Sequence, residues 1–328
     1  MKAAITGATG HVGVNLARVL LARGHHARAI VRRDVQGLEG LDVERVQGDV
    51  RDPASLAGAF RGVEVVFHVA ARISIVRSDR RKVAETNIDG TRNVLAACRE
   101  AGVRRLVHFS SIEALDGRPL DTRMDEERPF VDGTVGSPYA VAKAHGEQEV
   151  RRAIEEGLDA VILNPTAIVG PFDFKPSFLG KAVMALGSGS FPMLVDGGFD
   201  WVDVRDVAEG AVAAAERAPR GGRYILGGRW ASMVELATLA CEVTGARPPR
   251  LMCPYGLAMA FAPVSTGFCR LTGATPLFTT YSLRVLKGNR NVSHDRASRA
   301  FGYAPRDLRE TLRDTIAWFR RNGNGTGG

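Results

Sequence analysis

The chain has 328 residues, a net charge of +8, and 45% hydrophobic and 24% charged residues. This composition is typical of a globular protein with a substantial core and excludes a low-complexity chain. The four cysteines are scattered without a C-x-x-C pair, which favours reduced thiols in a cytoplasmic protein over a disulfide or zinc framework. Because the first apolar run is only a few residues long, we expect no signal peptide.

The first half of the chain alternates between strand and helix patterns. Strands are expected at 3–5, 26–31, 43–46, 63–69, 104–109 and 160–163, and helices at 14–22, 53–60, 80–101 and 137–156. This alternation predicts an α/β fold: a Rossmann doubly wound parallel sheet, covered on both faces and binding ligands at the carboxyl ends of its strands.

A glycine turn joins the first strand to the first helix and reads Thr6-Gly-Ala-Thr-Gly-His-Val-Gly13. Gly7 permits a tight turn, Gly10 lets the backbone approach a pyrophosphate, and Gly13 lets the helix pack close to the strand. Small residues after the fourth strand leave room for the cofactor ribose. Cofactor contacts are therefore expected from Gly7, Thr9, Gly10, His11, Val12, Gly13, Val69, Ala70 and Ala71.

The end of the second strand bears on the choice of cofactor. Arg32 comes first and is followed by Arg33, which favours a 2′-phosphate and hence NADP(H). Asp34 is a rival, since it lies about 20 residues past the glycine motif, where a carboxylate binds the ribose of NAD(H). After the third strand, Asp49 can accept a hydrogen bond from the adenine amino group, with Val50 beside it.

Tyr139 and Lys143 lie four residues apart on a helix that Ser137-Pro138 is well suited to begin. A lysine ammonium beside a phenol stabilises the phenolate and lowers its pKa, so Tyr139 can act as an acid or base. Ser111 ends the fifth strand, and its hydroxyl could bond the same substrate oxygen.

The order of these motifs resembles the extended short-chain dehydrogenase/reductases, the NAD(P)-dependent epimerase/dehydratase group, from Met1 to about Phe319. Within that group the chain is similar to dihydroflavonol-reductase-like, 3β-hydroxysteroid-dehydrogenase-like and hopanoid-associated sugar-epimerase-like proteins. The resemblance implies hydride transfer at nicotinamide C4, with proton transfer by Tyr139. It assigns the catalytic residues Ser111, Tyr139, Lys143 and Asn87, the nicotinamide-lining residues Pro165, Ala167 and Ile168, and a further motif at 201–208.

The residues after Ser111 bear on the reaction. Nucleotide-sugar dehydratases carry Asp-Glu there, but this chain has Ile112-Glu113, so we do not expect dehydration. Glu113 is either a substrate-facing acid–base group or a paired core carboxylate, and Ile112, Glu113 and Thr166 are candidate substrate contacts. We expect an oxidoreductase for a ketone, aldehyde or alcohol. The alternatives are a nucleotide-sugar epimerase with recycled nicotinamide and a non-catalytic cofactor-binding protein.

We expect a cofactor-binding domain at 1–170, to which 201–216 returns, a substrate-binding lobe at 171–321 and a disordered tail at 322–328. The apolar stretch 251–271 is broken by prolines and reads as a short helix: a packing helix, a lid or a membrane-surface contact. We expect a small-molecule substrate, no metal site, no nucleic acid and no stable membrane insertion. Family resemblance implies a homodimer formed through the 80–101 and 137–156 helices.

Overall fold

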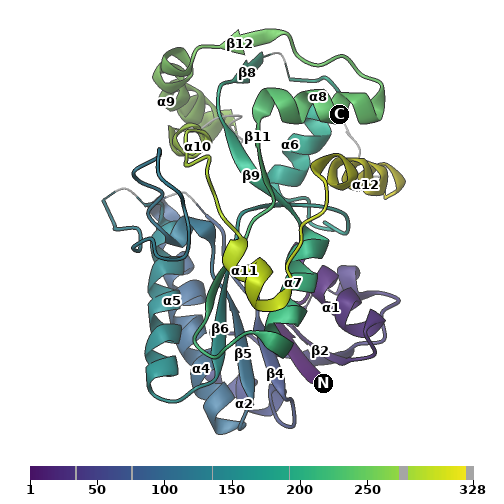
Figure 1. Ribbon diagram of the computed structural model, residues 1–328, viewed down its shortest axis with the longest axis vertical. Coiled ribbons are helices and arrows are strands. Elements are labelled where there is room, and N and C mark those ends of the chain that lie inside the picture. The colour runs from purple at the N-terminus through teal and green to yellow at the C-terminus, as the bar shows by residue number, and fades with distance from the viewer. Residues whose placement is uncertain (34, 75–76, 135, 192, 273–279, 323–328) are drawn as a thin grey trace.

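The computed structural model describes residues 1–33, 35–74, 77–134, 136–191, 193–272 and 280–322. Figure 1 shows a larger lobe built on a parallel sheet and a smaller lobe over the carboxyl ends of the strands. Asp34 and residues 323–328 of the expected tail lie outside the described residues. Asn322 lies inside them and ends the last helix, where its side-chain amide donates to the Trp318 carbonyl at 2.8 Å.

The described residues of the larger lobe form a seven-stranded sheet in the order β10-β6-β5-β4-β1-β2-β3, and all neighbours are parallel. Its strands are β1 (Lys2–Thr6), β2 (His26–Val31), β3 (Glu44–Gln47), β4 (Val65–His68), β5 (Arg105–Phe109), β6 (Ala160–Pro165) and β10 (Arg223–Leu226). The order 3-2-1-4-5-6 is that of doubly wound dinucleotide-binding sheets. The predicted fold class is confirmed.

Helices cover both faces of this sheet, which explains why Ala3, Ala4 and Ile5 of β1 are all fully buried. One face carries α1 (His11–Ala22), α7 (Val204–Arg217) and α11 (Asp295–Phe301), and the other carries α2 (Pro53–Ala59), α4 (Gly90–Glu100) and α5 (Pro138–Glu155). Two separate apolar cores result, one on each face of the sheet.

The helix expected at 80–101 is interrupted. It consists of α3 (Arg80–Ala84), a π-helical turn at Glu85–Asp89 and α4. At this turn α5 comes very close, since a Cβ on Gly146 would lie 2.5 Å from the Asn87 carbonyl oxygen. Such wide turns often occur at functional sites. Short helical turns also occur at Gln36–Leu38, Arg77–Asp79 and Ile112–Ala114.

The smaller lobe combines two small sheets with helices. Its strands are β7 (Ala167–Val169), β8 (Met193–Val195), β9 (Gly198–Asp203), β11 (Arg229–Ser232) and β12 (Leu251–Cys253). Its helices are α6 (Phe178–Gly187), α8 (Met233–Thr244), α9 (Tyr255–Thr272), α10 (Thr280–Leu286) and α12 (Leu308–Arg321). The apolar stretch 251–271 thus contains a short strand followed by a helix. Among the described residues, no helix has the length and apolar character that crossing a bilayer requires.

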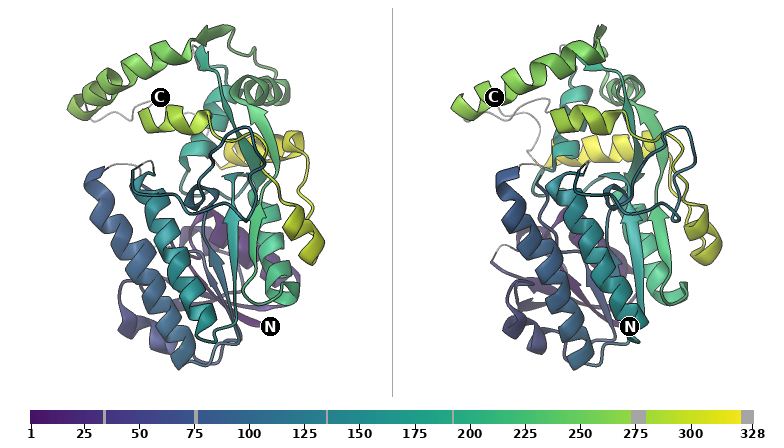
Figure 2. Two further views of the ribbon diagram at one scale, coloured as in Figure 1. Left: turned by 60° about the vertical axis from the view of Figure 1, so that its left-hand side comes forward. Right: turned by 90° about the vertical axis from the view of Figure 1, so that its left-hand side faces the viewer.

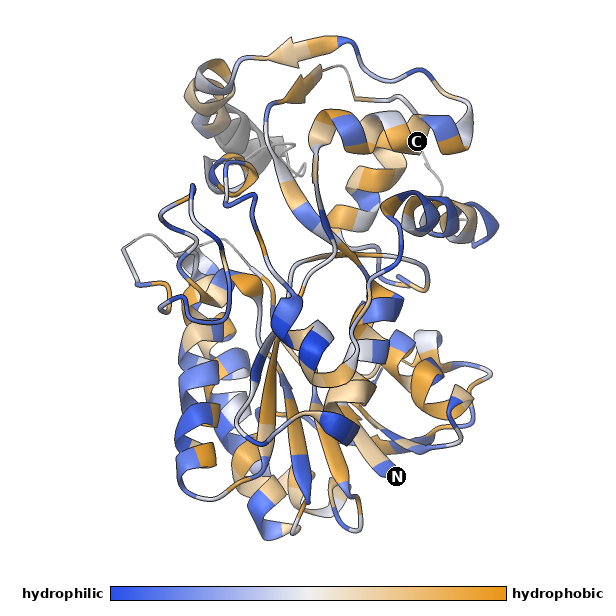
Figure 3. Cartoon of the chain, in the orientation of Figure 1, coloured by the Kyte–Doolittle hydropathy of each residue, from blue (hydrophilic) through white to orange (hydrophobic). Residues whose placement is uncertain are grey.

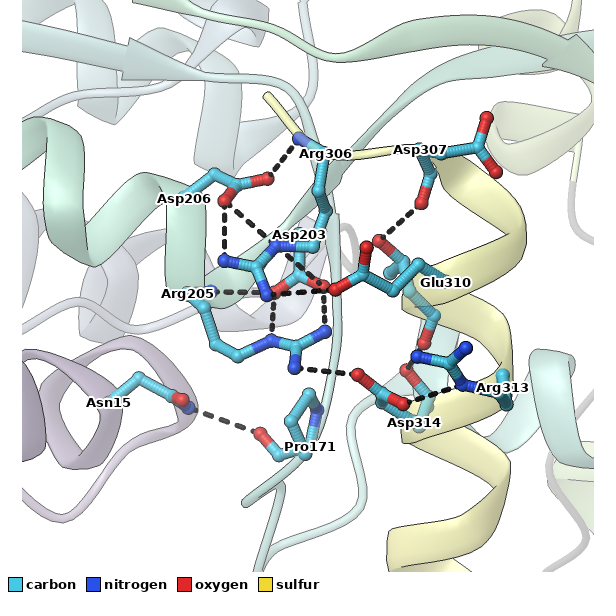
Figure 4. Close-up of polar contacts among 12 residues, drawn as sticks. Asn15, Pro171, Asp203, Arg205, Asp206, Arg306, Asp307, Glu310, Arg313 and Asp314 are labelled. Atoms are coloured by element: carbon cyan, nitrogen blue, oxygen red, sulfur yellow. Dashed lines mark hydrogen bonds and ion pairs between the residues drawn. The ribbon is translucent and has the colours of Figure 1, made fainter. Parts of the chain in front are cut away.

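A network of charged side chains joins α7 to α12 and its preceding loop (Figure 4). The buried Asp203 carboxylate accepts the Arg205 backbone N–H at 2.7 Å and pairs with the Arg205 guanidinium at 2.7 Å. Arg205 also pairs with Asp314 of α12 at 2.7 Å, and Arg306 pairs with Asp206 at 2.8 Å. The motif at 201–208 is therefore tied to the C-terminal helix.

Candidate active site

The carboxyl ends of β1, β4, β5 and β6 lie next to one another in the sheet, and most of the expected site residues lie in the segments that follow them. The glycine turn after β1 meets the segment after β4. A Cβ on Gly7, whose φ is +72°, would lie 2.7 Å from the Ala70 backbone nitrogen. Only glycine permits this approach. It places Gly7 beside Val69 and Ala70, at the point where the connections after β1 and β4 run to opposite faces of the sheet.

The glycine turn fits a pyrophosphate. A Cβ on Gly13 would lie 2.3 Å from the Gly7 carbonyl oxygen, so Gly13 allows close packing of helix and turn. A Cβ on Gly10 would contact only that carbonyl oxygen, at 3.3 Å, and its remaining surroundings are open. Gly10 is the N-cap of α1 and no side chain caps the helix, so the first backbone N–H groups can bind an anion.

Thr9, His11 and Val12 of the same turn differ in burial and in their contacts. Thr9 and Val12 are half-buried at the turn. His11 points away from it, because its Nε2 lies 3.1 Å from the Pro171 carbonyl oxygen, which also accepts from Asn15 at 3.1 Å. Burial lowers the pKa of His11, although the Asp173 charge opposes this effect. A contact of His11 with the cofactor would therefore come from its backbone.

Asp49 and the arginines lie at neighbouring carboxyl ends, after β3 and β2. Arg32 and Arg33 are exposed and form no hydrogen bond or ion pair within the described part of the chain. The Asp49 carboxylate is held by Arg51, with a shortest distance of 2.6 Å. The hydrogen bonds from Arg51 lower the pKa of Asp49, and the nearby Arg32 adds to this effect. Val50 is buried and packs against Gly90, away from solvent.

Asn87 anchors the segment after β4. Its side-chain oxygen accepts the Arg72 N–H at 2.8 Å, and its amide nitrogen donates to the Arg72 carbonyl at 3.0 Å. Both polar atoms of the amide are thus used on one loop residue. Asn87 positions the wall of the cofactor crevice and is not hydrogen-bonded to Tyr139 or Lys143 in the structure.

Ser111, Tyr139 and Lys143 come together at the carboxyl end of β5. The Ser111 hydroxyl lies beside the Tyr139 phenol, whose pKa it lowers, and it accepts the Glu113 N–H at 3.2 Å. Lys143 lies one turn further along α5 and donates to the Phe109 carbonyl at 2.6 Å. Ser137 caps α5 by accepting the Ala140 N–H at 3.0 Å, which sets the start of the helix that carries both residues.

The pKa of Tyr139 is raised, whereas the sequence predicted that Lys143 would lower it. Burial raises the pKa of Tyr139, and the Glu113 carboxyl adds to the effect, whereas the Ser111 hydroxyl opposes it. Burial also lowers the pKa of Lys143 to about 8, and Glu147 opposes this. In the protein alone, desolvation outweighs the expected stabilisation of a phenolate by lysine. Tyr139 is therefore held as the neutral phenol, which is the proton-donating form.

A buried polar chain supports Ser111 from behind. Asn164 of β6 donates to the Ser111 carbonyl at 3.0 Å and to the Glu147 carboxylate at 2.9 Å. Glu147 of α5 is fully buried and forms an ion pair with Arg223 of β10 at 2.8 Å. Three strands and α5 are thus cross-linked beneath the triad. Glu147 and Arg223 were not predicted from the sequence. Glu147 is 17 residues from Asn164 and 76 residues from Arg223, so no local pattern marks these contacts.

The comparisons with known proteins agree with this geometry. Residues 3–227 match the model of the NAD dependent epimerase/dehydratase family. The chain belongs to the NAD-dependent epimerase/dehydratase family. This membership confirms the resemblance found in the motifs and the expectation of an NAD(P)-dependent enzyme.

Two relatives and one solved structure define the position of the chain within the family. The chain is 39% identical to sterol demethylase protein B of Methylococcus capsulatus, over 98% of this chain and 99% of the relative. It is 32% identical to a putative dihydroflavonol 4-reductase of Synechocystis, over 97% and 94%. The crystal structure of gox2253 covers 99% of both chains, with 38% identity and a TM-score of 0.87.

In this epimerase/dehydratase-family chain, Glu113 has a partner that the sequence analysis missed. The Tyr281 hydroxyl, at the start of α10, donates to the Glu113 carboxyl at 2.5 Å. Burial raises the pKa of Glu113, and the hydrogen bond from Tyr281 opposes it. Tyr281 is also hydrogen-bonded to Ser137. The smaller lobe thus places a second phenol beside Tyr139, and no local sequence signal marks a contact across 168 residues.

The segment after β6 crosses from the large sheet to the small one. Pro165 ends β6, and Ala167 and Ile168 begin β7 in a half-buried position. Thr166 lies between the two strands, beside the buried Asp200 carboxyl. Ile112 is half-buried next to Ser111. In the described part of this family member, no group of three or more His, Cys, Asp and Glu side chains is placed to hold a metal ion.

Proposed function

We propose that the chain is an oxidoreductase that prefers NADP(H) and interconverts a ketone and a secondary alcohol on an apolar, ring-bearing small molecule. One observation carries this proposal: Ser111, Tyr139 and Lys143 converge at the strand end next to an uncapped glycine turn that fits a dinucleotide. That turn and the segment at 69–71 would hold the cofactor, which supplies or accepts the hydride.

The chain's own residues handle the substrate oxygen. In the reductive direction, the neutral Tyr139 phenol transfers its proton to the oxygen of the former carbonyl as negative charge develops there. The Ser111 hydroxyl lies beside the Tyr139 phenol and is placed to hold the same oxygen. Lys143 lies on the same face of α5 and brings positive charge, which stabilises the phenolate left behind. In the oxidative direction the proton returns from the alcohol to Tyr139.

The class of substrate rests on the relatives and on the chemistry of the site. The named molecules of the two relatives, a sterol and a dihydroflavonol, both carry oxygen on a largely apolar ring system. In this chain, Ile112 replaces the acid of the dehydratase pattern, and Glu113, whose carboxyl acts on the pKa of Tyr139, is bonded to Tyr281. An apolar substrate suits this environment better than a charged nucleotide sugar.

The test of the reaction is Tyr139→Phe, assayed with NADPH and a panel of cyclic ketones. We expect turnover to fall by about 10²- to 10⁴-fold, since the proton donor is removed. NADPH binding, followed by the fluorescence of the reduced nicotinamide, should stay close to that of the wild type. Turnover that survives the substitution would refute the assigned role of Tyr139.

The cofactor preference is tested by titrating NADPH and NADH side by side, on the wild type and on Arg32→Ala. We expect a preference for NADPH that collapses in the variant, because Arg32 is exposed and unpaired within the described residues. Arg61→Ala, which precedes β4 at the amino ends of the strands, is the control and should keep the preference. An unchanged NADPH preference in Arg32→Ala would contradict the assignment of the 2′-phosphate to Arg32.

A nucleotide-sugar epimerase is the second candidate, and it is favoured by the family whose model matches residues 3–227. Such an enzyme would retain its nicotinamide through the cycle. Purified protein carrying NAD that does not exchange, together with inversion of a sugar carbon without net redox change, would replace the oxidoreductase proposal with this one.

We further propose that the protein acts in the cytoplasm as a homodimer. The exposed sides of α4 and α5, at the left of Figure 1, would pack against the same helices of a second copy. The mass in solution, measured by light scattering, should be that of two chains. A mass of about 35.2 kDa, that of one chain, would exclude the dimer.

A further inference from the structure

Helix α9 has an apolar face that the protein does not cover. Its inner face carries Tyr255, Ala258, Met259 and Ala262, which pack into a core with Leu283 of α10. Leu257 and Phe261, one turn apart on another face, are 51% and 61% exposed. A water-exposed helix normally places polar residues there. Figure 2 shows α9 projecting at the periphery of the smaller lobe, beside α10.

The neighbouring small sheet extends this surface. Leu251 of β12 pairs with Met193 of β8, and both side chains are exposed, as is Met252. Figure 3 shows hydrophobic colouring on these two strands at the outer end of the smaller lobe. Five of the nine large hydrophobic side chains that are exposed in the described residues belong to this region: Met193, Leu251, Met252, Leu257 and Phe261. Because successive strand residues point to opposite sides, Met252 lies on the other side of the two strands from Leu251 and Met193. We call Met193, Leu251, Leu257 and Phe261 the outer apolar face.

The charges around the outer apolar face are mostly positive, although Asp196, directly after β8, pairs with Lys287. No Asp or Glu occurs between Glu242 and Asp295, and the charged residues of that stretch are Arg247, Arg250, Arg270, Arg284, Lys287 and Arg290. Arg247 and Arg250, which lead into β12, are exposed and form no ion pair within the described residues. Most of the net charge of +8 is therefore concentrated in one short stretch.

The exposed apolar side chains and the neighbouring arginines together indicate which kind of partner binds the outer apolar face. A second copy would bring its own arginines against these arginines, and that repulsion opposes self-association. An apolar side-chain cluster rimmed by basic residues matches a bilayer surface that contains anionic lipid, since the apolar side chains enter the acyl boundary and the arginines meet the headgroups. We infer that the outer apolar face docks the protein on an anionic membrane surface, with α9 lying in the interface and not crossing it.

Binding of the full-length protein to vesicles tests the inference independently of the proposed reaction. Sedimentation is compared for phosphatidylcholine vesicles and for vesicles of phosphatidylcholine mixed with phosphatidylglycerol. We expect binding to the mixed vesicles that weakens as salt is added. Leu257→Ser combined with Phe261→Ser should lower the partition coefficient about tenfold or more. Arg247→Gln combined with Arg250→Gln should lower it at least about fivefold.

Matched controls separate this surface from general stickiness and charge. Leu120→Ser removes an exposed leucine of the larger lobe, and Arg61→Gln with Arg104→Gln removes two exposed charges at the amino ends of β4 and β5. Both controls should bind vesicles like the wild type, and all variants should bind NADPH like the wild type. Because cofactor binding is measured separately, failure of the docking inference is distinguishable from failure of the proposed function.

Three outcomes would overturn the inference. The first is a wild-type protein that sediments with neither kind of vesicle. The second is equal loss of binding in the control variants. The third is a concentration-dependent self-association, measured by light scattering, that the Leu257→Ser and Phe261→Ser pair abolishes, because the face would then be covered by a second copy.

Discussion

Two glycines of the same turn should respond in opposite ways to the same substitution. In Gly13→Ala the new methyl would lie 2.3 Å from the Gly7 carbonyl oxygen and 2.7 Å from the Ala8 Cα. Both neighbours are backbone atoms, so the helix must shift, at a cost of about 3 kcal/mol or more. In Gly10→Ala the methyl would meet only one atom, at 3.3 Å, from an extended backbone that alanine adopts without strain. The expected change in folding free energy is within about 0.5 kcal/mol of zero.

Thermal unfolding and cofactor titration together make the comparison. Gly13→Ala should melt several degrees below the wild type. Gly10→Ala should melt with the wild type and yet bind NADPH at least about tenfold more weakly, since its methyl occupies the side of the turn that faces the pyrophosphate. If Gly10→Ala binds NADPH like the wild type, the phosphates do not lie at the start of α1, and the placement of the cofactor on this turn is wrong.

Three further substitutions test other contacts. Tyr281→Phe should destabilise the protein by about 1–3 kcal/mol, because the Glu113 carboxyl loses its hydrogen-bond donor. Glu113→Gln keeps an acceptor for the Tyr281 hydroxyl and should cost less. Chemical denaturation compares the two variants, and equal losses of stability would argue against the pairing. Asp203→Asn should cost about 1.5–3 kcal/mol, because it removes the charge of the fully buried carboxylate that pairs with Arg205 and Arg306, and Asp314→Asn, at the more exposed partner, about 1 kcal/mol or less. The unfolded chain holds a Lys143 proton up to about pH 10.5, whereas the folded protein releases it near pH 8, so the folded state binds fewer protons between these values. The stability of the wild type relative to Lys143→Met should therefore rise by up to roughly 3 kcal/mol from pH 8 to 10.5, and a flat difference in denaturation midpoints would contradict the lowered pKa.

The parts of the site that could be predicted from the sequence are those written in local patterns. Gly7, Gly10 and Gly13 combine a strand, a turn and a helix within a dozen residues, and Tyr139 and Lys143 share one face of one helix. Each of these patterns carries its own geometric reason, so the residues lie where they were expected. The doubly wound parallel sheet follows equally from the alternation of strands and helices.

The parts that could not be predicted depend on burial and on contacts between distant segments. The pKa of Tyr139 rises because of desolvation, with the Glu113 carboxyl adding to the effect, and the depth of burial is not visible in a spacing of four residues. Tyr281 reaches Glu113 only because α10 returns to the larger lobe. The helix expected at 80–101 was predicted without its π-helical turn, which lies where Gly146 of another helix comes close to the Asn87 carbonyl.

The position of β10 has a consequence for how the protein is made. This strand, at 223–226, lies at one edge of the large sheet and pairs with β6, yet it is synthesised after β7, β8 and β9 of the smaller lobe. Until it emerges from the ribosome, β6 is an uncovered edge whose free N–H and C=O groups can pair with another chain. A fragment ending near residue 170 should therefore aggregate, and one ending near 230 should stay dispersed. Translation thus produces β7, α6, β8 and β9 of the smaller lobe before the sheet of the larger lobe can be completed.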